Sequence, residues 1–277
     1  PSFFNVQLSV SVFNEMTNSS AIGLFDSGIG GLSIARKVRD LLPSENILYV
    51  ADSLHAPYGD KEDSFLLERM KAVTEFLLSR GAKAVVVACN TATTSAIAKL
   101  RCQYPVPIIG VEPGIKPAAL CSRTGVIGVL ATPGTLKTHS FVNLAERYAS
   151  GVKIELQPCP DLAAQIESLS FDSDRTIALL KRYISPLIEK KVDTIILGCT
   201  HYNHVSHLIA ELAGPDVTIV NTETAVANQV VRRLTAEGLL AAGNHVGRDE
   251  FWTSGVLDSY RNQIEKLWGP GENVFQL

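Results

Sequence analysis

The stretch VVVACNTAT at residues 85–93 decides the fold, because the chain repeats its pattern as TIILGCTHY at residues 194–202. Each stretch is an apolar run rich in β-branched residues, which is typical of a buried strand. Each run ends at a cysteine and continues into small polar residues. Cys199 follows Cys89 by 110 residues, so the repeat indicates two similar structural units that each end a strand with a thiol.

A second pair of stretches supports the repeat. IGLFDSGIGGL at residues 22–32 is similar to IGVLATPGTL at residues 127–136, with an offset of 105 residues. Two such units facing each other would place the two thiols across a shared cleft. The alternative is that short strand, loop and helix pieces look alike in any α/β protein.

Short apolar runs alternate with helical patterns from residue 21 onward, which favours the α/β class with parallel sheets covered by helices on both faces. We expect two similar doubly wound domains related by pseudo-twofold symmetry, with the active site between them. The expected division is an N-terminal extension at residues 1–20, a first domain of residues 21–106 plus about 218–277, and a second domain of residues 107–217. The predicted strands are Ile22–Phe25, Ile47–Ala51, Ala84–Ala88, Ile108–Val111, Val126–Leu130, Lys153–Leu156, Thr194–Leu197 and Val217–Val220, and predicted helices include Glu62–Ser79, Leu136–Tyr148, Arg175–Lys190 and Ala225–Ala236.

Composition narrows the classes of function. The 277 residues are 46% hydrophobic and 19% charged, with a net charge of -3, which is globular composition without the basic character of a nucleic-acid-binding protein. No apolar run reaches the roughly 20 residues of a membrane span. The five cysteines contain no CxxC pair, which favours a reducing cytoplasm. A small-molecule substrate fits best, and a monomer and a homodimer remain equally open.

Ligands of open parallel sheets bind beyond the carboxyl ends of the strands. In this chain those positions carry small polar residues, acids and thiols: Asp26-Ser27-Gly28, Asp52-Ser53, Cys89-Asn90-Thr91, Glu112-Pro113, Ala131-Thr132-Pro133-Gly134 and Cys199-Thr200-His201. The sequence therefore predicts a polar site that both units share.

Cys89 and Cys199 differ from the other cysteines in their positions. Each follows an apolar strand and precedes a helix start, where backbone N–H groups and the helix dipole are expected to lower a thiol pKa. Cys102 and Cys121 fit the ordinary role of small core residues. Inversion at a carbon needs a base on one face and an acid on the other, and two thiols can supply both.

Six blocks then carry a resemblance over nearly the whole chain: FDSGIGGLS at 25–33, PYG at 57–59, VVACNTAT at 86–93, VEPGIKPA at 111–118, ATPGTLK at 131–137 and LGCTHY at 197–202. Together they resemble bacterial glutamate racemases. The resemblance implies a cofactor-independent, two-base interconversion of L- and D-glutamate, which would supply D-glutamate for peptidoglycan synthesis. Related aspartate racemases share the two cysteine blocks, so aspartate is the alternative substrate.

The resemblance also implies roles for individual residues. Cys89 would exchange the α-proton of D-glutamate with help from Asp26, and Cys199 that of L-glutamate with help from His201 and Glu167. The role of Glu167 depends on aligning the segment PCPDLAAQIE with the family, and this segment departs from the family's usual apolar run. The implied substrate contacts are Asp26, Ser27, Pro57, Tyr58, Gly59, Asn90, Thr91, Thr132, Thr135, Thr200 and His201. Chemically, Asp26 suits the substrate ammonium, and the hydroxyl and backbone N–H donors suit its carboxylates.

Several other interpretations remain open at this stage. The segment Gly28–Ser33 after a strand, with Asp52 downstream, resembles a dinucleotide-binding turn, although Ser33 replaces the third glycine. If no dinucleotide binds, Asp52 is either a loop residue that caps a turn or a residue that shapes the site. His201, His204 and His207 have a spacing that could hold a metal, but no acidic partner is near in sequence.

Cys199 and His201 alone would suit a hydrolase, which leaves Cys89 without a role. An amino-acid-binding protein on the same fold is the non-enzymatic alternative. Some relatives with N-terminal extensions respond to a UDP-linked muramyl precursor, and residues 1–20 raise the same hypothesis for this chain.

Overall fold

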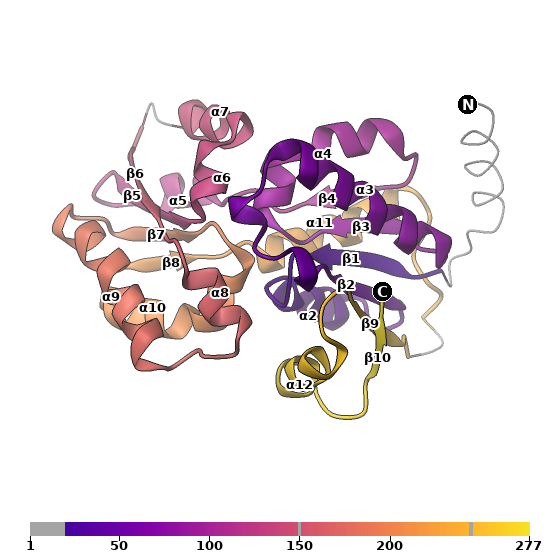
Figure 1. Ribbon diagram of the computed structural model, residues 1–277. Coiled ribbons are helices and arrows are strands. Elements are labelled where there is room, and N and C mark those ends of the chain that lie inside the picture. Colours follow the sequence, from indigo (N-terminus) through magenta and orange to yellow (C-terminus); the bar gives the residue numbers. More distant parts are fainter. Residues whose placement is uncertain (1–19, 149–150, 244–245) are drawn as a thin grey trace.

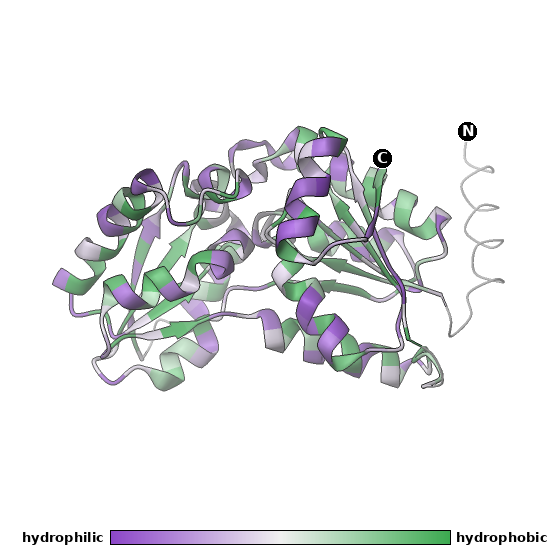
Figure 2. Cartoon of the chain, turned by 90° about the horizontal axis from the view of Figure 1, so that it is seen from below, coloured by the Kyte–Doolittle hydropathy of each residue, from purple (hydrophilic) through white to green (hydrophobic). Residues whose placement is uncertain are grey.

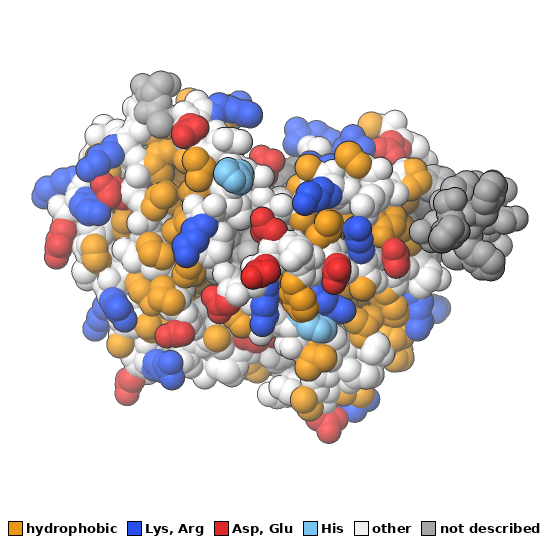
Figure 3. All heavy atoms as spheres, turned by 45° about the horizontal axis from the view of Figure 1, so that its top comes forward, with side chains coloured by type: hydrophobic (Ala, Val, Ile, Leu, Met, Phe, Trp, Pro, Cys, Tyr) orange, Lys and Arg blue, Asp and Glu red, His pale blue; other side chains and the backbone are white. Residues whose placement is uncertain are grey.

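The computed structural model describes residues 20–148, 151–243 and 246–277, which form two α/β domains lying side by side (Figure 1). The predicted extension at residues 1–20 therefore lies, except for Ser20, outside the described residues. Among the helices of the described segments, none is both long and apolar enough to cross a membrane. On the face drawn in Figure 3, basic and acidic side chains are interspersed rather than gathered by sign.

The first domain contains a six-stranded sheet in which every described strand pair is parallel. Its spatial order is β10 (Asn273–Gln276), β9 (Asp249–Thr253), β2 (Ile47–Ala51), β1 (Ile22–Asp26), β3 (Ala84–Val87) and β4 (Ile108–Gly110). Asp26 pairs with Ala51 and Phe25 with Val87, so β1, β2 and β3 end at the same edge. That register brings the residues after these strands together, as the sequence predicted.

Helices cover both faces of this sheet. On one face lie α2 (Leu32–Leu41), α11 (Glu223–Ala236) and α12 (Leu257–Leu267), whose buried side chains share a core with β1 and β2. On the other face lie α3 (Asp63–Ser79) and α4 (Asn90–Gln103). Figure 2 shows the strands as mostly hydrophobic and the helices as two-sided, because a strand of a covered parallel sheet is buried on both faces.

The second domain contains a four-stranded parallel sheet in the order β6 (Lys153–Pro158), β5 (Val126–Ala131), β7 (Thr194–Leu197) and β8 (Thr218–Val220). One face packs against α8 (Leu162–Glu167), α9 (Asp174–Glu189) and α10 (Ser206–Ala213). The other face packs against α5 (Ile115–Cys121) and α7 (His139–Tyr148). In this sheet β5 lies between β6 and β7, just as β1 lies between β2 and β3 in the first sheet. The two sheets therefore share a strand order, in agreement with the predicted repeat.

The chain passes between the two sheets twice. Residues 111–114 lead from β4 to α5, and residues 221–222 lead from β8 to α11. The two crossings are adjacent, because a Cβ atom added at Gly114 would lie 2.9 Å from Val220 Cγ1. The main chain therefore joins the two domains at one place.

Some local expectations were wrong. The predicted helix Leu136–Tyr148 is two helices, α6 (Pro133–Lys137) and α7, separated at Thr138. The Thr138 hydroxyl accepts a hydrogen bond from the Phe141 backbone N–H at 3.2 Å, so it caps the second helix and ends the first. Cys102 and Cys121 are exposed free thiols and not core residues.

A buried carboxylate forms hydrogen bonds with the segment that leads into the second domain. Asp193 precedes β7 and accepts hydrogen bonds from the Ser122 hydroxyl and the backbone N–H groups of Arg123 and Thr124, at 2.6–2.7 Å. Burial opposes ionisation of this group, but the hydrogen bonds from Ser122, Thr124 and Arg123 outweigh it and lower the pKa of Asp193 to about 2. These hydrogen bonds hold residues 122–124, which precede β5, next to the start of β7.

We expect Asp193→Asn to destabilise the protein by about 1–2 kcal/mol at pH 7, because the folded state holds the carboxylate more tightly than the unfolded state does. A lowered folded-state pKa stabilises the fold above the unfolded pKa near 4 and stops doing so as the pH falls toward about 2. Urea denaturation followed by circular dichroism should therefore show a difference that shrinks between pH 5 and pH 2. The exposed Asp172→Asn is the control; a pH-independent difference would contradict the prediction.

Candidate active site

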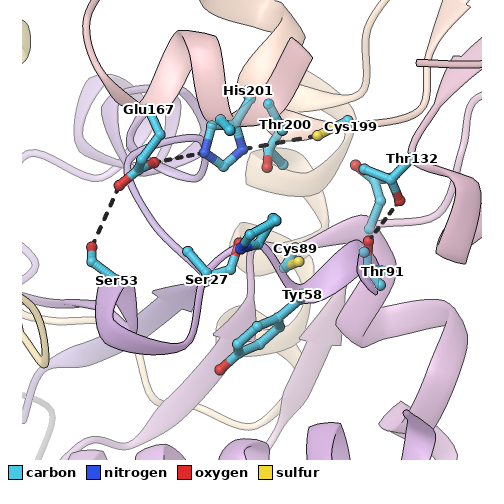
Figure 4. A pocket seen from close by; sticks show the side chains of 16 residues that line it. Ser27, Ser53, Tyr58, Cys89, Thr91, Thr132, Glu167, Cys199, Thr200 and His201 are labelled. Atoms are coloured by element: carbon cyan, nitrogen blue, oxygen red, sulfur yellow. Dashed lines mark hydrogen bonds and ion pairs between the residues drawn. The ribbon is translucent and has the colours of Figure 1, made fainter. Parts of the chain in front are cut away.

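A small cavity lies between the two domains, at the carboxyl ends of both sheets (Figure 4). Its volume is about 180 Å³, below the range of pockets for drug-sized ligands, so it suits a small metabolite. Its walls come from both domains: Ser27, Ser53, Ala56, Pro57, Tyr58, Gly59, Cys89, Asn90 and Thr91 from the first, and Thr132, Ala163, Ala164, Glu167, Cys199, Thr200 and His201 from the second.

Cys199 belongs to a chain of three polar side chains in the second domain. It follows β7 and precedes the short 3₁₀ helix η3 (Thr200–Val205). The Cys199 Sγ lies 3.8 Å from His201 Nδ1, and His201 Nε2 lies 2.7 Å from Glu167 Oε2. The imidazole therefore sits between a thiol and a carboxylate, with one ring nitrogen toward each (Figure 4).

His201 is buried, and its surroundings decide its charge. Burial alone would lower the pKa of His201, but the Cys199 sulfur and the Glu167 carboxylate raise it well above the ordinary value of 6.5. These two neighbours favour the protonated, positively charged form of His201. A positive imidazolium next to a sulfur atom stabilises negative charge on that sulfur, so His201 is placed to support Cys199 during a proton transfer.

Cys89 has a different environment in the first domain. It occupies the N-cap position of α4, as predicted, but the expected lowering of its pKa was wrong. Burial, followed by the negative charge of Asp26, raises the pKa of Cys89 well above 9.0. The backbone N–H of Ala92 works in the other direction and is outweighed. Cys89 is therefore a protonated thiol at neutral pH.

Asp26 lies behind the cavity wall. Its carboxylate is fully buried and accepts hydrogen bonds from the backbone N–H groups of Ser27 and Gly31, both at 2.7 Å, and from the Thr200 hydroxyl at 3.2 Å. Burial raises the pKa of Asp26, which the charge of His201 and the nearby Cys89 partly offset. Asp26 thereby joins the two domains beneath the two thiols.

The glycine-rich turn after β1 is filled by side chains of the second domain. A Cβ atom at Gly28 would lie 2.1 Å from Glu167 Oε2, and one at Gly30 would lie 2.5 Å from His201 Nδ1. The Ile29 backbone N–H donates to Glu167 Oε2 at 2.9 Å. The glycines therefore allow close approach of Glu167 and His201, and the turn leaves no space there for the pyrophosphate of a dinucleotide.

Three threonine hydroxyls form a closed ring across the domain boundary. Thr91 Oγ1 lies 3.2 Å from Thr132 Oγ1 and 2.9 Å from Thr135 Oγ1, and the latter two lie 3.0 Å apart. Beside the ring, a Cβ atom at Gly134 would lie 2.2 Å from the Gly59 carbonyl oxygen. Small residues at 59 and 134 therefore let the backbones of the two domains meet next to the cavity.

Asp52 shapes the wall that carries the PYG block. Its carboxylate accepts two hydrogen bonds from Arg69 at 2.9 Å and one from the Tyr58 hydroxyl at 2.6 Å. Burial opposes its ionisation, but the hydrogen bonds from Arg69 and Tyr58 keep the pKa of Asp52 below 3.8. Of the two roles left open for Asp52, the structure supports the shaping of the site.

Most of the predicted site residues lie on the cavity wall. Asp26 and Thr135 are instead buried behind it. Ser53, one of the residues expected at the carboxyl ends of the strands, also lines the cavity. The sequence did not point to Ala56, Ala163 or Ala164, which line it as well. Ala163 lies one turn before Glu167 on the same helix, a spacing that could have indicated it.

The histidine spacing does not produce a metal site. Within residues 20–148, 151–243 and 246–277, no cluster of histidine, cysteine and acidic side chains is arranged to hold a metal ion. His204 Nε2 lies 3.2 Å from the Ile29 carbonyl oxygen, and burial lowers the pKa of His204 to about 4. His207 is exposed.

Comparison with known proteins agrees with this geometry. The model of the Asp/Glu/Hydantoin racemase family matches residues 33–230. A glutamate racemase from Pseudomonas paraeruginosa is 48% identical over 260 residues, covering 94% of this chain and 98% of that protein. A glutamate racemase from Methylococcus capsulatus is 49% identical over 254 residues, covering 92% and 93%.

Solved structures give the same result. A glutamate racemase from Bacillus anthracis superposes with a TM-score of 0.86 at 32% identity, covering 94% of this chain and 98% of that chain. The Escherichia coli glutamate racemase, solved with L-glutamate and the activator UDP-MurNAc-Ala, has a TM-score of 0.82 at 29% identity and covers 93% and 97%. With two thiols facing one cavity between two parallel-sheet domains, the chain belongs to the Asp/Glu/Hydantoin racemase family, in the group of the glutamate racemases.

Proposed function

We propose that this protein interconverts L- and D-glutamate without a cofactor, with Cys89 and Cys199 as the two acid–base groups. The observation that carries the proposal is the pair of thiols, one from each domain, on the wall of the same 180 Å³ cavity. A thiol and a thiolate on opposite sides of an α-carbon supply the acid and the base that inversion requires. The relatives described above, which are named glutamate racemases, support glutamate as the substrate.

We infer the starting roles from the two environments. In the proposed mechanism Cys199, supported by His201, takes the α-proton of L-glutamate as a thiolate, while the buried thiol of Cys89 protonates the opposite face to give D-glutamate. The bond from the α-carbon to its first hydrogen breaks, and a new one forms from the Cys89 proton. The product leaves with the proton positions of the two sulfurs reversed, and D-glutamate is converted by the reverse sequence.

The rest of the wall supplies donors for the two substrate carboxylates. Hydroxyls of Ser27, Thr91, Thr132 and Thr200 surround the space, together with the Asn90 amide, and such groups bind carboxylates without a full positive charge. Asp26 would act on the substrate ammonium and on Cys89 from beneath the wall. A shorter acidic amino acid would not span the same donors, so we expect glutamate to be turned over faster than aspartate.

The product indicates a role in the cell. D-glutamate is a component of peptidoglycan, so the enzyme would supply a precursor for cell-wall synthesis and cell shape. The five cysteines are free thiols, which accords with our inference that the enzyme acts in the reducing cytoplasm.

Replacement of either thiol tests the two-base mechanism. We expect Cys89→Ser and Cys199→Ser each to lower kcat by about 10²–10⁴-fold, the usual contribution of a positioned acid or base. Cys102→Ser, an exposed thiol that does not line the cavity, is the matched control. In D₂O the wild-type protein should incorporate deuterium at the α-carbon of both enantiomers. Intact racemisation in both cavity variants would refute the mechanism, and absence of label with the wild type would indicate a binding protein.

The pH dependence tests the part played by Glu167. Removal of its negative charge in Glu167→Gln should lower the pKa of His201, which the carboxylate helps to raise. His201 then loses its proton at lower pH, and the alkaline decline of kcat/KM should begin at lower pH than in the wild type. Rates for each enantiomer between pH 6 and pH 10 measure this shift. An alkaline decline that stays in place would show that Glu167 does not act through His201.

We further propose that a UDP-linked muramyl precursor activates the enzyme, since the Escherichia coli relative binds UDP-MurNAc-Ala as an activator. A second cavity of about 630 Å³ lies beside the two interdomain crossings. Arg101, Lys116, Arg232 and Arg233 are among its lining residues, and their positive charges suit a diphosphate. A ligand held there would contact both domains.

This activation can be tested by measuring racemisation rates with and without UDP-MurNAc-Ala. The measurements are made on the full chain and on a chain that begins at Ser20. We expect the precursor to raise kcat, and Arg232→Ala to weaken that response without changing the rate in its absence, since Arg232 lies outside the cavity that holds the two thiols. Unchanged rates in every combination would rule the activation out.

A further inference from the structure

The C-terminal helix of the first domain contacts the end of α8 in the second domain. Gln263 on α12 donates from Nε2 to the Glu167 carbonyl oxygen at 2.7 Å. The Gln263 residue is 8% exposed, so this hydrogen bond is shielded from water. Residue 263 also lies beyond the part of the chain that matches the racemase family model, which ends at residue 230.

The contact is made at the C-terminal end of α8, where the backbone carbonyl groups need hydrogen-bond donors from outside the helix. Glu167 is the last residue of α8, and the final carbonyl groups of a helix have no partner within it. Gln263 supplies that partner from the other domain. Its amide therefore fixes the main chain of Glu167 relative to the first domain.

The turn that follows Glu167 is held by the same helix. Leu169 has a left-handed backbone with a φ of 60°, and Leu169 and Phe171 pack against the core that contains Tyr260 and Ile264 of α12. Lys266 Nζ lies 5.5 Å from the centre of the Phe171 ring. α12 thus holds the end of α8 through an amide, apolar contacts and a cation–π contact.

The position of the Glu167 main chain decides where its carboxylate lies. Glu167 Oε2 receives the Ile29 backbone N–H at 2.9 Å and contacts His201 Nε2 at 2.7 Å, while the side chain is 19% exposed. A shift of the α8 end away from the first domain would lengthen these contacts. The effect would then pass through His201 to Cys199, whereas Cys89 is supported by Asp26 within its own domain.

We propose that Gln263 is a positioning residue that aligns Glu167 and His201 for proton transfer at Cys199. This inference rests on the proposed racemase function. It predicts an effect on one of the two proton transfers, which a general loss of folded enzyme would not produce.

Isotope effects separate the two transfers. The enantiomers have equal free energy, so a higher barrier at Cys199 lowers kcat/KM equally in both directions. However, when the Cys199 transfer limits the rate, L-glutamate deuterated at the α-carbon reacts with a larger isotope effect, because its label is removed in that step. D-glutamate deuterated at the α-carbon reacts with a smaller one, because its label is removed in the faster step at Cys89.

The test compares Gln263→Met, which keeps length but lacks the donor, with Asn262→Met on the exposed side of the same helix. We expect Gln263→Met to lower kcat/KM by about 10- to 100-fold, as small misplacements of reacting groups do. The isotope effect on kcat/KM should rise for L-glutamate and fall for D-glutamate. Asn262→Met should match the wild type. Unchanged isotope effects, or equal changes for the two enantiomers, would overturn the proposal.

A measurement without turnover keeps this test separate from the proposed function. In protein labelled with ¹⁵N-histidine, with His201 assigned from the spectrum of His201→Asn, the imidazole of His201 should titrate at lower pH in Gln263→Met than in the wild type. Asn262→Met should leave the titration in place. If the wild-type protein fails to racemise glutamate, the proposed function is wrong, while this titration still decides whether Gln263 positions Glu167. An unchanged titration would refute the positioning role.

Discussion

The hydrogen bonds of the Glu167 carboxylate link the two domains beside the cavity, and the geometry around His201 depends on them. One oxygen, Oε2, accepts the Ile29 N–H of the first domain and contacts the His201 ring of the second. Because hydrogen bonds to an ionised acceptor are strong, this oxygen fixes the distance between the glycine-rich turn and η3. The same carboxylate, together with the Cys199 sulfur, raises the pKa of His201.

The two thiols have different environments although they follow equivalent strands. Cys199 lies beside a cation, and Cys89 lies in a buried place beside a carboxylate. The proposed reaction does not require symmetrical surroundings, because in that mechanism each turnover would return one sulfur to the thiol form as the other becomes a thiolate.

Much of this arrangement could be predicted from the sequence, since it depends on local order along the chain. The positions after β1, β3, β5 and β7 were identified because parallel strands end at a common edge. The pKa of Cys89 could not be predicted, because burial and the charge of Asp26 are tertiary effects. The exposure of Cys102 and Cys121 likewise depends on which side of a helix or turn faces solvent.

Two strands of the first sheet were also missed. β9 reads DEFWT, with two acids at its start, and β10 is an edge strand with exposed polar positions, so neither shows the apolar run of a central strand. No sequence pattern indicated Gln263, because its proposed positioning role depends on a contact with Glu167, which lies 96 residues away in the chain. Long-range contacts of this kind depend on the packed fold.

The late position of β9, α12 and β10 in the chain has a consequence for biosynthesis. β5 to β8 are contiguous between residues 126 and 220, so the second domain can fold before the first is complete. The outer edge of β2 pairs with β9, which ends at Thr253. At 5–20 residues per second the ribosome needs roughly 10–40 s to travel from the end of β2 to the end of β9. An unpaired strand edge is open to aggregation during that interval. The helix that carries Gln263 emerges after every residue that lines the cavity, so the hydrogen bond from Gln263 to Glu167 forms only after the cavity walls have been synthesised.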